Sequence, residues 1–200
     1  MQLPLYFDYA CPWAYLGSSR AESYFRDLEV EIDFRPVHLR RLVEPGVGKP
    51  PELGPRKQKN AANDIRHWAE ALGVEFDPAA RALYKTDSSL ALRCALVAKE
   101  LGRFRELHYP LYRARWAQAR DLGRDDVLAE LLRGAGLDAA AVLARAKSPE
   151  LEERLTRDTE AAVGRGVFGV PTLFVGDEMF WGNDRFELVR FYAAKAAGRA

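Results

Sequence analysis

Cys11 is the residue of this chain with the clearest capacity for chemistry. It stands in the segment Cys11-Pro12-Trp13-Ala14, directly after an apolar run and directly before a helical pattern. Proline suits the first turn of a helix, because its missing N–H would be unpaired there. Cys11 is then expected at the N-cap, where free backbone N–H groups and the helix dipole favour the thiolate. The sequence therefore predicts a thiol pKa below the ordinary value.

The same segment shows what this cysteine lacks. In a Cys-x-x-Cys site the second thiol would stand at position 14, where this chain has Ala14. A thiol without a resolving partner cannot run ordinary dithiol exchange, so the handling of an external thiol is favoured. The alternative is that Cys11 is a small buried hydrophobe, which is the usual fate of free cysteine. Cys94 lies on an apolar helical stripe and is expected in the core.

The two ends of the chain predict the elements that position Cys11. The first end follows the pattern strand, helix, strand, and the other end follows the pattern strand, strand, helix. Gly176-Asp177 separates the two later strands and suits a tight hairpin turn. The expected elements are a strand over 3–7, a helix over 13–27, a strand over 30–35, strands over 172–175 and 178–181, and a helix over 184–197.

The stretch between these ends is expected to be helical, after a Pro- and Gly-rich connection over 43–55. Gly73 and Gly102 each follow the last apolar position of a helical pattern, as C-cap residues do. The helices expected are 57–72, 90–101, 103–118, 125–133 and 148–163. We therefore predict an α/β, thioredoxin-like fold with an all-helical insertion. Residues 1–41 and 166–200 would form the thioredoxin-like domain, and 42–165 the insertion.

Composition excludes several classes of partner. The 200 residues are 48% hydrophobic, which is enough for one well-buried core. Lys and Arg number 30 against 29 Asp and Glu, so the net charge of +1 gives no footprint for nucleic acid. No apolar run has the length of a membrane span. Three scattered histidines lack metal-ligand spacing. We expect a cytoplasmic protein that binds no metal, nucleic acid or membrane.

Four segments occur in an order that resembles a known family. They are Cys11-Pro-Trp-Ala-Tyr-Leu-Gly17, Gly48-Lys-Pro-Pro-Glu-Leu-Gly-Pro-Arg-Lys57, Gly166-Val-Phe-Gly-Val170-Pro171-Thr172 and Trp181-Gly-Asn183-Asp184-Arg185. The ordered set resembles the DsbA-like superfamily, in the branch that holds 2-hydroxychromene-2-carboxylate isomerases and kappa-class glutathione transferases. The likeness covers essentially the whole chain.

This resemblance implies glutathione, or another low-molecular-weight thiol, as the cofactor. The family position that faces the cofactor sulfur corresponds to Cys11, where most members have Ser. Lys57 matches a lysine that contacts the tripeptide. Gly48 departs from the pattern, because kappa enzymes carry a glutathione-contacting Asn there. The resemblance also places Val170 before a cis-proline, matched by Pro171, and makes Asn183 and Asp184 the pair that binds the γ-glutamyl end.

These residue types suit a short anionic peptide with a free amine. A cis bond before Pro171 would turn the Val170 N–H and C=O outward as an edge for strand-like pairing. Asn183 could cap the last helix, whose free N–H groups attract a carboxylate. Asp184 could bind the ammonium, and Lys57 a carboxylate. Each has an ordinary alternative: a trans proline, plain helix capping, or a solvated lysine.

The leading hypothesis is a glutathione-dependent isomerase or transferase in which Cys11 stabilises the cofactor thiolate. The resemblance implies a small aromatic substrate, and a homodimer is compatible with it. Trp13 and Trp181 would line the acceptor pocket or lie in the core. Two hypotheses from other classes stay open. One is a single-cysteine thiol-disulfide oxidoreductase, in which Cys11 itself attacks disulfides. The other is a non-catalytic thioredoxin-like binding module.

Overall fold

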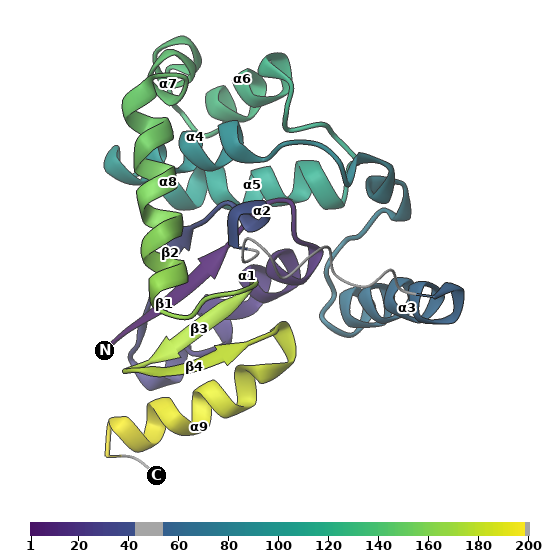
Figure 1. Cartoon of the computed structure of the whole chain (residues 1–200), viewed down its shortest axis with the longest axis vertical. Coiled ribbons are helices and arrows are strands. Elements are labelled where there is room, and N and C mark those ends of the chain that lie inside the picture. Colours follow the sequence, from purple (N-terminus) through teal and green to yellow (C-terminus); the bar gives the residue numbers. More distant parts are fainter. Residues whose placement is uncertain (43–53, 199–200) are drawn as a thin grey trace.

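Within residues 1–42 and 54–198, which the computed structural model describes, four strands form one mixed sheet (Figure 1). They are β1 (Gln2–Phe7), β2 (Glu31–Pro36), β3 (Thr172–Val175) and β4 (Glu178–Trp181). Their order is β2-β1-β3-β4, with β1 parallel to β2 and antiparallel to β3. The strands β3 and β4 form the expected antiparallel hairpin. The predicted thioredoxin-like α/β fold is confirmed.

The register between β1 and β3 brings the two ends of the chain together. Tyr6 pairs with Thr172, and Leu5 pairs with Leu173. Because the two strands are antiparallel, the residues that follow β1 lie beside the residues that precede β3. This places the turn that contains Cys11 next to Val170 and Pro171, although about 160 positions of the sequence separate them.

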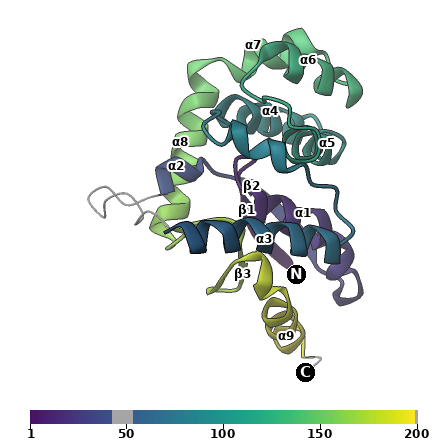
Figure 2. The ribbon, with the colours of Figure 1, turned by 90° about the vertical axis from the view of Figure 1, so that its right-hand side faces the viewer.

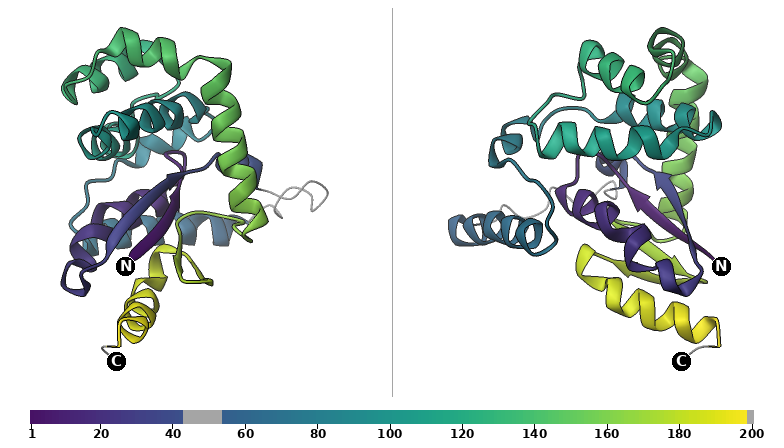
Figure 3. Two further views of the ribbon diagram at one scale, coloured as in Figure 1. Left: turned by 90° about the vertical axis from the view of Figure 1, so that its left-hand side faces the viewer. Right: turned by 180° about the vertical axis from the view of Figure 1, so that it is seen from behind.

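Helices cover both faces of the sheet. The helices α1 (Pro12–Tyr24) and α9 (Phe186–Ala196) lie on one face, and α8 (Pro149–Gly164) lies on the other (Figures 1 and 3). Phe25, directly after α1, packs on Phe186 at the start of α9 with ring centroids 5.3 Å apart. As expected for a helix that begins Ser-Pro, the Ser148 hydroxyl accepts a hydrogen bond from the Leu151 N–H.

The five expected internal helices are all present, as α3 to α6 and α8, and the sequence reasoning missed two others, the short α2 and α7. Besides α8, the helices of this region are α2 (Leu39–Leu42), α3 (Pro55–Ala71), α4 (Ser89–Glu100), α5 (Phe104–Trp116), α6 (Asp125–Gly134) and α7 (Ala139–Ala146). Helix α7 was missed, although Asp138 caps it by accepting from the N–H groups of Ala140 and Ala141. Cys94 is fully buried in α4, as predicted. Within the described residues, no helix is long and apolar enough to cross a membrane.

Helix α3 is set apart from α4 to α7, which stack beyond one end of the sheet (Figures 1 and 2). It lies beside α1, and Ala69 is the one buried position among those of its side chains that the structure describes. Between β2 and β3 in the sequence, α3 therefore lies beside α1, whereas α4 to α7 lie together beyond the end of the sheet. The assignment of 42–165 to a domain separate from 1–41 and 166–200 stays a prediction.

Candidate active site

Cys11 occupies the N-cap of α1, as its sequence context predicts. Its backbone is extended, with φ −104° and ψ 116°, and its C=O accepts the first helical hydrogen bond, from the Tyr15 N–H at 3.1 Å. Pro12 is the first residue of the helix. The Cys11 side chain is nearly enclosed, with 6% of the residue exposed. Its Sγ donates a hydrogen bond to the Val170 C=O at 3.2 Å.

The predicted low pKa of Cys11 is wrong in this structure. Burial raises the pKa of the thiol to about 12, and the N–H groups of Trp13 and Ala14 offset only part of that rise. The nearby Asp8 carboxylate raises the pKa further. The N-cap position supplies the expected stabilisation of the thiolate, but the loss of water costs more. Near neutral pH, Cys11 is a thiol that donates a hydrogen bond.

The turn before Cys11 is held by a buried carboxylate. Asp8 Oδ1 accepts from the Ala10 N–H at 2.8 Å, and Oδ2 accepts from the Leu39 N–H at 2.7 Å. Asp8 is 1% exposed, and burial raises the pKa of its carboxyl group. The side chain joins the turn to the segment after β2. It therefore fixes the backbone that carries Cys11.

Helix α5 holds the same turn from the other side. The Tyr112 hydroxyl donates to the Asp8 C=O at 3.1 Å, and Trp116 Nε1 donates to the Tyr9 C=O at 2.9 Å. His108 Nδ1 lies 3.0 Å from the Tyr9 hydroxyl oxygen. These three α5 side chains are spaced four residues apart, so they lie along one face of the helix. The sequence reasoning missed this stripe, which its spacing could have indicated.

The Val170–Pro171 peptide bond is cis, as predicted. Of the two Val170 backbone groups expected to face a ligand, the C=O instead accepts the Cys11 Sγ–H. Within the described residues, the Val170 N–H donates no hydrogen bond. Pro171 packs closely on α1, because a Cβ at Gly17 would lie 3.2 Å from its Cγ. One edge group of Val170 is therefore available and the other is occupied.

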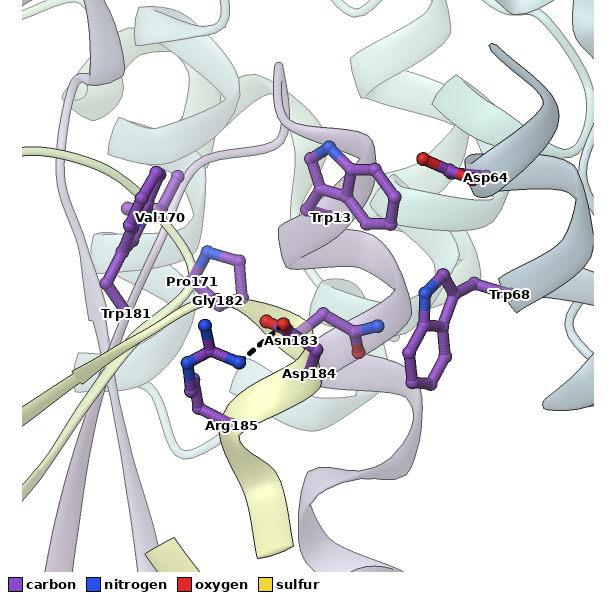
Figure 4. A pocket seen from close by; sticks show the side chains of 10 residues that line it. All are labelled: Trp13, Asp64, Trp68, Val170, Pro171, Trp181, Gly182, Asn183, Asp184 and Arg185. Carbon is purple, nitrogen blue, oxygen red and sulfur yellow. Dashed lines mark hydrogen bonds and ion pairs between the residues drawn. The ribbon is translucent and has the colours of Figure 1, made fainter. Parts of the chain in front are cut away.

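A cavity of about 420 Å³ opens beside this segment (Figure 4). Its walls come from α1, α3, the Val170–Pro171 bond, β4 and the 3-10 turn Asn183–Arg185. Three indoles line it, from Trp13, Trp68 and Trp181. Trp13 is partly buried and Trp181 is 51% exposed, so both line the cavity rather than lie in the core, and their contact with an aromatic substrate stays a prediction.

Asn183 lies in the wall of this cavity, but it does not cap the last helix. That prediction is wrong, because a 3-10 turn intervenes and α9 begins only at Phe186. Asn183 is 2% exposed, and neither Nδ2 nor Oδ1 of its amide has a partner within the described residues. Its backbone C=O accepts from the Arg20 guanidinium. A buried amide with no partner is costly unless something else binds it.

The two predicted charged ligands are placed differently. Asp184 lines the cavity and is half-exposed, and its Oδ2 lies 2.6 Å from Arg185 Nη1. Lys57 is exposed near the start of α3 and lies in a neighbouring hollow, which meets the cavity at Asp64. The structure brings Asp184 to the cavity but not Lys57. The departure at Gly48 lies outside the described residues.

Comparison with known proteins agrees with this geometry. The model of the DSBA-like thioredoxin domain family matches residues 2–192. The chain belongs to this family. It is 28% identical to a 2-hydroxychromene-2-carboxylate isomerase from Sphingobium xenophagum, over 95% of this chain and 96% of that protein. It is 25% identical to human glutathione S-transferase kappa 1, over 92% and 87%. A solved 2-hydroxychromene-2-carboxylate isomerase structure superposes with a TM-score of 0.81 at 25% identity, covering 100% of this chain and 95% of that one.

In this DSBA-like domain, three site residues were not found from the sequence. Asp64 and Trp68 are one turn apart on α3 and both face the cavity. Arg20 of α1 lies behind Asn183, with its guanidinium carbon 4.3 Å from the Phe186 ring centroid and 5.4 Å from that of Trp68. Burial lowers the pKa of Arg20. The i, i+4 spacing of Asp64 and Trp68 was the available signal, but nothing local showed which wall α3 would face.

The lining of the cavity suits a small organic ligand. Within the part of the chain that the structure describes, no group of three or more His, Cys, Asp or Glu side chains could hold a metal ion. The cavity offers indole faces and a paired carboxylate and guanidinium, and the unpaired Asn183 amide is enclosed in its wall. Such a combination of apolar walls with a few polar groups is typical of small-molecule sites.

Proposed function

We propose that this protein is a glutathione-dependent isomerase or transferase that acts on a small aromatic substrate. The observation that carries the proposal is the state of Cys11. Its thiol is buried, bonded to the Val170 C=O and without a partner cysteine, since Ala14 stands at the resolving position. A protonated thiol is a poor attacking group but a competent hydrogen-bond donor. Such a donor suits the stabilisation of a cofactor thiolate.

The residues present fit a thiol peptide. The Val170 N–H faces no partner within the described residues, and strand-like pairing with a cysteinyl unit would use it. The Asn183 amide supplies one acceptor and two donors, all unused. A volume of about 420 Å³ lies in the usual range for small-molecule sites. The names of the relatives, which include a glutathione transferase, support the choice of glutathione.

In the proposed reaction, each of the site residues would have a distinct role. When bound, glutathione would supply a thiolate that adds to a conjugated carbon of the substrate and leaves after a bond has rotated. Cys11 would turn its S–H from the Val170 C=O toward that thiolate. The Trp13 and Ala14 N–H groups, which already lower the pKa of the Cys11 thiol, would keep its sulfur in place. Trp13 and Trp181 would pack on the substrate ring.

The test compares Cys11→Ser with Cys11→Ala. A serine hydroxyl donates as well as a thiol, so Cys11→Ser should keep glutathione-dependent turnover of hydroxychromene carboxylate within about tenfold, which is about 1.4 kcal/mol in the barrier. Cys11→Ala has no donor and should lose considerably more. Reduction of a small mixed disulfide is measured in parallel. Strong disulfide reduction by the wild type, without isomerisation by any variant, would reject the proposal in favour of the oxidoreductase.

The second candidate function is the single-cysteine oxidoreductase. It is favoured by the residue type at position 11, a cysteine where the resemblance leads us to expect serine. It is opposed by the raised pKa of that thiol. We extend the proposal to a cytoplasmic location, where thiol cofactors stay reduced, and to the absence of nucleic acid and membrane partners. A homodimer is part of the same proposal, and mass measurement in solution tests it.

A further inference from the structure

The two edge strands of the sheet, β2 and β4, differ in how their outer edges are protected. The Glu31 N–H bonds to the residue before β1, so the backbone groups of Phe34 and Pro36 alternate to the outer side of β2. Pro36 has no N–H, and Lys99 Nζ donates to the Phe34 C=O at 2.8 Å. Lys99 also pairs with Asp33 on the same strand. Proline and charged side chains protect an edge strand from pairing with another chain, and β2 has both.

The outer edge of β4, the last strand of the sheet, lacks this protection, since its four residues include no Lys and no Pro (Figure 1). The Gly182 N–H bonds to the Pro171 C=O of the neighbouring chain segment at 2.9 Å. Because strand residues alternate, the backbone groups of Met179 and Trp181 point to the outer side. Within the described residues, no strand or loop bonds to them there. An edge of this kind is a template for a further strand.

Exposed apolar side chains flank this edge on both faces of the sheet. On one face, Trp181 and Phe168 are both half-exposed and lie with their ring centroids 4.8 Å apart. On the other face, Phe180 lies beside Tyr192 of α9 with ring centroids 5.3 Å apart, and the exposed Phe191 precedes Tyr192. A group of large exposed apolar side chains marks an interaction site, whereas single ones do not.

A second copy of this chain fits this edge, because β4 is complementary to itself when two such strands run antiparallel. Pairing centred on Phe180 places Met179 of one copy opposite Trp181 of the other, and the reverse, about a two-fold axis. The outward N–H and C=O groups of both residues then gain partners. The Met179 and Trp181 side chains of the two copies meet on one face of the joined sheet, and the two Phe180 side chains meet on the other.

The charges at the two ends of β4 match in the same pairing. Asp177 and Glu178, at the start of the strand, are exposed and form no ion pair within the described residues. Arg185 follows the end of the strand and pairs with Asp184 beside it in the chain. Antiparallel pairing brings the acidic end of each copy beside the Arg185 end of the other. Opposite charges across an interface fix its register and exclude other partners.

We infer that β4 is the interface of a two-fold symmetric homodimer, in which the sheets of both copies join along their β4 edges. The inference rests on the proposed function only for the expectation of a homodimer, and it does not depend on the chemistry of Cys11. Trp181 also lines the cavity, so the partner copy covers one side of a residue of the site. Self-association therefore holds the Trp181 indole in place at the edge of each cavity.

The test measures molar mass by sedimentation equilibrium over a range of protein concentrations. Met179→Pro removes an outward N–H and keeps the bonds of β4 to β3, and Met179→Leu is its matched control because it keeps the N–H and an apolar side chain. Glu178→Arg and Arg185→Glu each place like charges together across the interface, and the double variant restores opposite charges. Glu153→Arg is the control reversal, at an exposed residue of α8. Circular dichroism checks that all variants fold.

The wild type, Met179→Leu and Glu153→Arg should be dimers with similar dissociation constants. Met179→Pro and each single charge reversal at Glu178 or Arg185 should raise that constant about tenfold or more, and the double reversal should return it toward the wild-type value. A monomeric wild type, or a dimer that these variants leave unchanged, would overturn the β4 interface. Glutathione-dependent turnover is measured on the same wild-type protein. A dimer that depends on β4 but shows no turnover leaves the interface standing and rejects the proposed reaction.

Discussion

The two walls of the candidate site differ in how their polar groups are used. On one wall, the turn that carries Cys11 is bonded within the protein: Asp8 binds two backbone N–H groups, and Tyr112 and Trp116 bind two backbone carbonyls. On the other wall, the Asn183 amide has no partner within the described residues. The Cys11 wall is therefore organised before any ligand arrives. The wall of α3 and the 3-10 turn instead contains a polar side chain, Asn183, that has no hydrogen-bond partner within the described residues.

This difference bears on how the site would work. A donor such as the Cys11 S–H is effective only if its position is set in advance, because reorganisation during the reaction is costly. The buried turn meets that requirement. The opposite wall instead carries the Asn183 amide, which has no partner within the described residues, and such a group gives selectivity between ligands that can and cannot pair with it. Under the proposed function, the chemistry would come from the Cys11 turn, which adjoins the cavity through Trp13 and Val170, and selection would come from the wall of α3 and the 3-10 turn.

The largest expected effect concerns the reactivity of Cys11. A thiol whose pKa is about 12 should be alkylated near pH 8 roughly a thousandfold more slowly than an ordinary cysteine, whose pKa is about 8.5. Rates of iodoacetamide labelling for the Cys11 peptide, followed by mass spectrometry from pH 6 to 10, measure this. The same protein unfolded in urea is the control. A labelling midpoint near or below 8.5 in the folded protein would show that helix-terminus stabilisation outweighs burial.

A second prediction concerns how the free energy of unfolding depends on pH through His108, which contacts the turn that carries Cys11. Burial, with a smaller contribution from Arg105, lowers the pKa of His108 to about 3. In the unfolded chain the pKa is about 6.5, so below that pH the unfolded state binds a proton that the folded state does not. The contribution of His108 to the free energy of unfolding is complete above pH 6.5, and it is lost as the pH falls toward 3. Between pH 7 and 5 the loss should be about 2 kcal/mol.

Urea denaturation at pH 7, 6 and 5 tests this effect, with His108→Gln as the comparison. The variant should be less stable at pH 7, because it disturbs the contact with the Tyr9 hydroxyl. Its stability should change less between pH 7 and 5, since the titrating group has gone. Equal pH dependence in the two proteins would mean that His108 is not kept neutral by burial.

Sequence reasoning succeeded where the signal is local. The N-cap position of Cys11 follows from Pro12, and the hairpin follows from Gly176-Asp177 between two apolar runs. The strand and helix order at both ends was sufficient for the fold. The family resemblance, more than the residue types alone, gave the cis bond before Pro171. The cap and the hairpin depend on residues that are neighbours in the chain, and the fold and the cis bond depend on the order of segments along it.

It failed where a property depends on packing between distant segments. The pKa of Cys11 is raised, whereas the sequence predicted that it would be lowered. The residues around position 11 do not show that the Val170 segment encloses the thiol. Asn183 was expected as a cap, but the chain inserts a 3-10 turn before Phe186. Asp64 was not considered, since only the fold shows that α3 borders the cavity.

The smallest expected effect contrasts two buried polar residues, Asn183 and Thr172. The Thr172 hydroxyl donates to the Gly169 C=O at 2.7 Å, whereas the Asn183 amide has no partner within the described residues. Replacing Asn183 by Leu removes an unpaired buried amide while keeping its size, so the free energy of unfolding should rise by about 1 kcal/mol. Replacing Thr172 by Val removes a satisfied hydroxyl and should lower it by a similar amount.

The variant that is more stable should be the one that binds glutathione more weakly. Asn183→Leu, although more stable, should bind glutathione about tenfold more weakly, because the group reserved for the ligand has gone. Thr172→Val should bind it nearly as the wild type does, since its hydroxyl is already used within the protein. Urea denaturation and calorimetry on the same preparations give both quantities. If Asn183→Leu proved less stable than the wild type and bound glutathione unchanged, the amide would be a structural group, and both walls would then be organised in the same way.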